Sequence, residues 1–150
     1  MLTDTLGIEI MDIIRRDTDY AFRLAVQLAR SRDGDKPLSA RLLAKETKVS
    51  YPLTCKILQK MAHAGIVRSV MGARGGWKLA KEPENIPFRD LVEAVQGPLS
   101  VNRCLLGNFK CPLKGTCPAH PKMAALQRKI DGFLQELTLK EFTGKETTHE

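Results

Sequence analysis

Residues 39–65 carry the pattern that most restricts the fold, two short helices joined by a tight turn. Ser39 and Ser50 are favourable N-cap residues, placed eleven positions apart. Pro52 would lie in the first turn of the second helix, where its missing N–H costs nothing, and Gly65 follows the expected helix end. This spacing predicts a helix-turn-helix whose second helix enters a DNA groove.

The two predicted helices each have an apolar and a polar side. We expect the first, about residues 40–47, to bury Leu42, Leu43 and Ala44. The second should direct Leu53, Ile57, Leu58 and Met61 to the core. Its DNA-contacting residues would be Ser50, Tyr51, Thr54, Lys56 and Lys60. Lys48 occupies the turn, where glycine is often preferred.

Two short strands, about residues 66–70 and 77–80, flank a glycine-rich tip and predict a β-hairpin directly after the second helix. A hairpin in this place is a wing. Its candidate DNA contacts are Arg68, Arg74, Gly75 and Lys78, with Arg74 suited to the minor groove. The alternative is an ordinary hairpin with solvated arginines.

Three further helices are expected around this module. Asp17, Thr18 and Asp19 supply caps for a helix through about Ser31, and a short helix covers about residues 87–95. After Pro121 an apolar seam recurs at steps of three and four. It consists of Met123, Leu126, Ile130, Phe133 and Leu137. We interpret it as a dimerisation helix rather than intramolecular packing, with Thr138 capping a final short turn.

The fold class is therefore mainly α with a small β-hairpin wing, a winged helix-turn-helix domain plus a long C-terminal dimerisation helix. The expected parts are an N-terminal extension (1–10), the winged domain (11–97), a cysteine loop (98–121), the dimerisation helix (122–142) and a disordered tail (143–150).

The cysteine loop concentrates metal-binding side chains. Cys104, Cys111 and Cys117 are spaced C-x6-C-x5-C, and His120 follows two residues further on. Glycine and proline keep the segment out of helix and sheet, so it can turn several side chains toward one point. Clustered thiolates suit an iron–sulfur cluster, [2Fe-2S] or [4Fe-4S], or zinc.

Charge is unevenly distributed along the chain. Residues 11–81 hold 15 Lys and Arg against 6 Asp and Glu, whereas residues 82–150 hold 9 of each. A basic half joined to a neutral half indicates a phosphate-binding module with a separate regulatory part. No apolar run is long enough to cross a membrane and no secretory signal is present, so we expect a cytoplasmic protein with reduced thiols.

The order of these elements and their local sequences resemble the Rrf family of bacterial winged-helix transcription regulators. The resemblance covers about residues 11–142. The family includes the IscR-like and NsrR-like iron–sulfur cluster sensors. It is carried by Thr18–Arg23, Ala62–Val70, Gly75–Ala80, Val92–Pro98 and the cysteine loop. It implies a cytoplasmic homodimer, in most cases a repressor, that binds an inverted-repeat site in double-stranded DNA.

The resemblance implies Cys104, Cys111 and Cys117 as cluster ligands. The fourth ligand would be His120, as in the IscR-like branch, or Asp19 from the other subunit, as in the NsrR-like branch. The sequence leaves both open, because both residue types are present. The alternative to a ligand role is that Asp19 is only a helix-cap carboxylate and that His120 caps the helix starting near Pro121. Cys55 stands where IscR-like members carry a DNA-reading glutamate, so the resemblance does not extend to the target sequence.

Two other metal-loop hypotheses remain beside the cluster sensor. One is a structural Cys₃His zinc site, and the other is a metal-free thiol switch in which the cysteines form disulfides. An enzyme is not expected, because no paired nucleophile and base and no phosphate-binding loop stand out, and no small-molecule substrate is implied.

Overall fold

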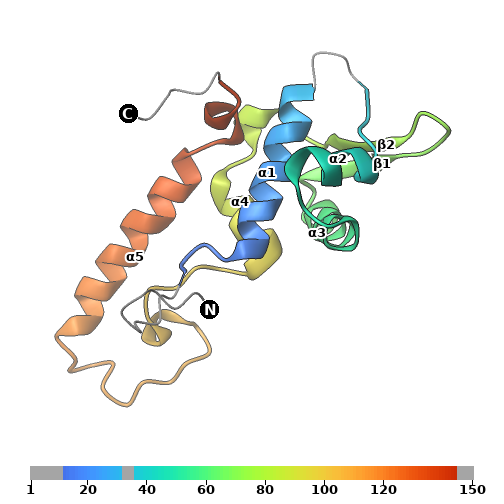
Figure 1. Ribbon diagram of the computed structural model, residues 1–150. Coiled ribbons are helices and arrows are strands. Elements are labelled where there is room, and N and C mark those ends of the chain that lie inside the picture. The colour runs from blue at the N-terminus through green and yellow to red at the C-terminus, as the bar shows by residue number, and fades with distance from the viewer. Residues whose placement is uncertain (1–11, 32–35, 145–150) are drawn as a thin grey trace, which may run out of the picture.

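The computed structural model of the chain describes residues 12–31 and 36–144 (Figure 1). The predicted extension over 1–10 and the tail beyond 144 lie outside the described residues, as does most of the predicted turn near residues 32–37. The described part contains five α-helices and one antiparallel hairpin. They are α1 (Arg16–Arg30), α2 (Ala40–Thr47), α3 (Tyr51–His63), β1 (Val67–Val70), β2 (Gly76–Leu79), α4 (Phe88–Gln96) and α5 (Ala119–Glu136). Short 3-10 turns are η2 (Pro83–Asn85), η3 (Arg103–Leu105) and η4 (Leu139–Phe142). The predicted fold class is confirmed.

The core lies between α1, α3 and α4, with α2 and the hairpin closing one side. Leu24, Leu58 and Leu91 are completely buried there. Apolar residues at steps of three and four place one stripe of each helix in this core. Of the residues expected to be buried on α2, Leu43 and Ala44 are buried, but Leu42 is 41% exposed.

Helix α1 starts earlier than its sequence suggests. Asp17, Thr18 and Asp19 were expected to cap it, but the helix begins at Arg16, and Arg15 is the N-cap residue without a side-chain capping bond in the described structure. The end of α4 supplies the missing acceptor, since the Arg15 N–H donates to Gln96 Oε1 at 2.9 Å. A partner about 80 residues away replaces the local cap.

The predicted hairpin is present and is attached to the start of α2. Leu38 and Trp77 exchange two backbone hydrogen bonds of 3.0 and 2.8 Å. At Gly76, with φ +156°, an added Cβ would lie 2.5 Å from the carbonyl oxygen of Leu38. Glycine at this position therefore allows the two segments to approach closely.

The region 122–142 contains more than one element. Helix α5 ends at Glu136, and Thr138 and Glu141 then form a capping box for η4, so the predicted final turn is confirmed. The Leu139 N–H donates to the Ile86 carbonyl at 2.9 Å, and the Leu139 side chain is completely buried. Burial of a leucine contributes about 1.5–3 kcal/mol, so η4 anchors the far end of α5 to the winged domain. No helix of the described residues is long and apolar enough to cross a membrane.

Candidate nucleic-acid interface and cysteine loop

The helix-turn-helix is built from the local signals expected of it. Ser39 Oγ accepts a hydrogen bond from the Leu42 N–H at 3.2 Å. Lys48 adopts a left-handed conformation, with φ +56°. Glycine is the usual residue in such turns because it adopts this conformation without strain. Ser50 is the N-cap residue of α3, but its hydroxyl makes no capping bond in the described structure. Ser50 is exposed just ahead of the helix.

One predicted contact residue on α3 has the opposite orientation. Thr54 is completely buried and its hydroxyl has no hydrogen-bond partner among the described residues. It lies one turn before Leu58 and therefore shares the core face with Ile57 and Leu58. The prediction that Thr54 lies on the DNA-facing side is wrong, because it followed side-chain polarity instead of helical position.

Lys60 is also placed differently from the prediction. It is half-buried, and its ammonium donates a hydrogen bond to the Val95 carbonyl oxygen at 3.1 Å. Val95 lies in the last turn of α4, where carbonyl oxygens lack helical partners and attract cations. In this structure Lys60 joins α3 to α4 and does not project from the outer face of α3.

The residues left on the outer face of α3 include Tyr51 and Lys56, both exposed. The Arg41 guanidinium of α2 lies 4.9 Å from the centre of the Tyr51 ring. A cation held over a ring in this way is attracted by the ring's negative face. Arg41 was missed by the sequence reasoning, although its exposed position opposite Leu43 could have indicated it.

The tip of the wing is exposed and tightly turned. Arg74 is exposed, and Met71 is 91% exposed. The Gly75 N–H donates to the Gly72 carbonyl at 2.9 Å, and a Cβ on Gly75 would lie 2.2 Å from the Val70 carbonyl oxygen. The backbone turn at the tip therefore excludes any side chain at Gly75.

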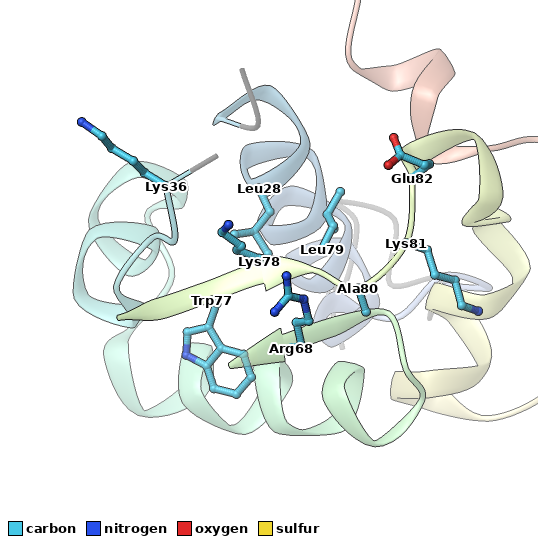
Figure 2. Close-up of a pocket in the computed structure, with 9 residues that line it drawn as sticks. All are labelled: Leu28, Lys36, Arg68, Trp77, Lys78, Leu79, Ala80, Lys81 and Glu82. Carbon is cyan, nitrogen blue, oxygen red and sulfur yellow. The ribbon is translucent and has the colours of Figure 1, made fainter. Parts of the chain in front are cut away.

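The sides of the wing carry further positive charge. Arg68 is exposed and pairs across the hairpin with Lys78, which is half-buried. A pocket of ≈ 200 Å³ lies beside them at the base of the hairpin. Figure 2 shows the basic side chains around it, which are Lys36, Arg68, Lys78 and Lys81. Lys36 also lines a groove of ≈ 630 Å³ between the start of α2 and the wing, together with Ser39 and Arg74.

The cysteine loop extends below the winged domain and leads into α5 (Figure 1). Cys104 lies in η3, whereas Cys111 and Cys117 lie in irregular backbone, and all three are half-buried free thiols. Within residues 12–31 and 36–144, no three His, Cys, Asp or Glu side chains are close enough together to hold a metal ion. The structure therefore does not bring the three predicted ligands together. Cys55, on α3, is also a free thiol.

The two candidates for a fourth ligand differ in their surroundings. His120 lies in the first turn of α5, with Pro118 as the N-cap residue, so His120 is not a helix cap. Its Nδ1 atom is buried and has no hydrogen-bond partner among the described residues. Asp19 is not a helix cap either, because Arg15 is the N-cap residue of α1. The Oδ2 atom of Asp19 pairs with Arg23 Nη2 at 2.6 Å.

Comparison with known proteins identifies the family. The sequence matches the Rrf2 family, described as iron-dependent transcriptional regulators, over residues 14–145. The chain belongs to the Rrf2 family. An HTH-type transcriptional regulator of Aquifex aeolicus is 32% identical over 132 residues, which cover 87% of this chain and 90% of that protein. The repressor NsrR of Streptomyces coelicolor is 31% identical, with 87% of each chain covered.

A solved Rrf2-type structure has the same fold. CymR, the global cysteine regulator of B. subtilis, aligns with a TM-score of 0.71 at 23% identity, covering 89% of this chain and 97% of that chain. Because its family and these two relatives are transcriptional regulators, this Rrf2 chain is a winged-helix transcriptional regulator and not an enzyme. The family resemblance stated from the sequence is confirmed.

Proposed function

We propose that this Rrf2 protein is a homodimeric repressor whose binding to an inverted-repeat operator is controlled by an iron–sulfur cluster in the cysteine loop. The observation that carries the proposal is that a DNA-binding module and a cysteine loop are directly connected in one chain. An exposed helix-turn-helix and wing are joined through α4 to a loop with three free thiols and an unpaired histidine nitrogen.

The DNA-binding face in this proposal consists of α3 and the wing. Tyr51, Lys56 and Arg41 would enter or border the major groove, and Arg74 would enter the neighbouring minor groove. Ser50, Gly75, Arg68 and Lys78 would contact the sugar-phosphate backbone. Thr54 and Lys60 are left out of the contact set, because one is buried and the other is bonded to α4.

The dimer interface in this proposal is the outer face of α5. Phe133 is 64% exposed and Leu126 is 46% exposed, although both belong to the apolar seam. Large apolar side chains repeated along one helix face are usual for a helix that packs on a partner. A two-fold axis through this helix would pair two recognition helices and match an inverted repeat.

The donor set of the cysteine loop suits an iron–sulfur cluster. Three thiols supply the sulfur ligands that iron prefers, and the buried, unpaired Nδ1 of His120 is a suitable fourth donor. Asp19 of the partner subunit is the other candidate, and it would have to leave Arg23. When bound, a cluster would supply an iron that reacts with oxygen or nitric oxide or is lost when iron is scarce. The family description as iron-dependent and the similarity to NsrR support this choice.

A metal-free thiol switch is the second candidate function. The three thiols are not gathered into one site in the described structure, and free thiols can oxidise to disulfides without a metal. The absorption spectrum and metal content of protein purified without oxygen separate these two candidates and a structural zinc site. Visible sulfur-to-iron bands support the cluster, whereas colourless protein with bound zinc supports a structural zinc site. Colourless, metal-free protein with intact operator binding supports the thiol switch.

A further inference from the structure

The C-terminal turn of α4 is a junction between the recognition helix α3, helix α1 and the cysteine loop. Two neighbouring residues of this turn make the connections. The Val95 carbonyl accepts the hydrogen bond from Lys60 Nζ at 3.1 Å. Lys60 belongs to the third turn of α3, so this bond fixes the recognition helix to the end of α4 in addition to its apolar contacts there.

Gln96 makes the second set of connections. Its Oε1 accepts from the Arg15 N–H at 2.9 Å and from the Thr18 hydroxyl at 2.7 Å, and its Nε2 donates to the Ile13 carbonyl at 3.0 Å. The Gln96 side chain therefore holds both the segment before α1, through Ile13 and Arg15, and the first turn of α1, through Thr18. A displacement of α4 at this point has to move α1 and α3 together or break these bonds.

The cysteine loop begins immediately after the junction and is clamped to α5 there. Gln127 of α5 accepts from the Val101 N–H at 2.8 Å and donates to the Leu99 carbonyl at 2.8 Å. Asp131 accepts a second bond from the Gln127 amide at 2.9 Å, which holds that side chain in place. Only residues 97 and 98 separate the junction from the clamped segment.

We infer that Lys60 is a positioning residue, not a DNA ligand, and that it carries the state of the cysteine loop to the recognition helix. The inference rests on the proposed function, since it presumes that the loop controls operator binding. A change in the conformation of the cysteine loop displaces the backbone at Leu99 and Val101. Residues 97 and 98 transmit that displacement to Val95. The Lys60 bond converts that movement into a tilt of α3, which a repeat site of fixed spacing detects.

A purely structural role for Lys60 predicts a different result. A lysine that only satisfies a helix C-terminus stabilises the fold equally in every state of the loop. Its removal would then leave unchanged the ratio of operator affinities between two loop states. Only a lysine that transmits the loop state changes that ratio.

The test is a double-mutant cycle between Lys60→Met and Cys111→Ala, with operator affinity measured for the full-length protein purified without oxygen. Cys111→Ala perturbs the loop and is expected to change the affinity of the otherwise wild-type protein by about 5–150-fold, the usual range of coupling between sites. In the Lys60→Met background the same change should fall below about threefold. Lys60→Arg, which keeps a cationic donor, should restore most of the effect.

Lys56→Met is the matched control, one turn earlier on α3 and exposed. It should weaken both loop states equally and preserve the ratio. If Cys111→Ala has its full effect in the Lys60→Met background, the coupling role of Lys60 is wrong while the sensor proposal stands. If Cys111→Ala has no effect in the wild-type background, the sensor proposal itself fails.

Amide hydrogen exchange in the absence of DNA covers the case in which Lys60→Met abolishes binding. Cys111→Ala should change the protection of α3 amides in the wild-type background and leave it unchanged with Lys60→Met. An equal change in both backgrounds overturns the inference.

Discussion

The side-chain carbonyl of Gln96 accepts a hydrogen bond from the Thr18 hydroxyl at 2.7 Å, across 78 positions of sequence. The same oxygen accepts from the Arg15 N–H, so a residue at the end of α4 caps the start of α1. Thr18 is completely buried, which makes its hydroxyl costly to leave unpaired.

Gln96→Met should therefore destabilise the fold. Because a buried hydroxyl and the N-cap N–H both lose their acceptor, we expect the free energy of unfolding to fall by about 1–3 kcal/mol, measured by urea denaturation. Gln135→Met, at an exposed position of α5, should change it by less than about 0.5 kcal/mol. Equal stability of the two variants would show that the Gln96 bonds do not hold α1.

Thr54→Val should leave operator affinity within about twofold of wild type. The Thr54 hydroxyl is buried without a hydrogen-bond partner in the described chain, so an isosteric methyl should also leave stability unchanged or raise it by about 1 kcal/mol. Tyr51→Ala, on the outer face of the same helix, is the comparison and should weaken binding. A Thr54→Val protein that binds as poorly as Tyr51→Ala would contradict the orientation of α3.

These residues mark the limit of what the sequence could predict. The caps Ser39 and Thr138, the turn at Lys48 and the hairpin are local features, and each was placed correctly because neighbouring residues determine it. The partners of Lys60 and Gln96 lie 35 or more positions away, and no local pattern identifies them. The position of the three cysteines depends on irregular backbone, for which the sequence gives ligand types but no geometry.

Arg74→Ala should cost about 1–3 kcal/mol of specific operator binding, because the exposed wing tip would lose its minor-groove cation. Affinity should be measured by fluorescence anisotropy at one salt concentration. Lys140→Ala, at an exposed position of η4, removes the same charge far along the chain and should have little effect. Equal affinities of the wild type and Arg74→Ala would exclude the wing from the interface.

Phe133→Glu should dissociate the dimer, since it would bury an unpaired charge in the apolar seam of α5. Sedimentation velocity should show a shift toward monomer, and circular dichroism should show a folded chain because Phe133 is 64% exposed in the single chain. Arg128→Glu, at an exposed position of α5 on the side away from the seam, is the control. An intact dimer with Phe133→Glu would place the interface elsewhere.

The most direct test of cluster-controlled DNA binding is the affinity of one operator, selected from a random library, for two preparations of the same protein. One preparation is purified without oxygen and carries its visible absorption, and the other is stripped of iron by chelation, both at one salt concentration. We predict affinities that differ by at least about fivefold, with the difference lost in Cys111→Ala. Equal affinities for a protein that demonstrably carries a cluster would contradict the sensor and leave a structural metal site.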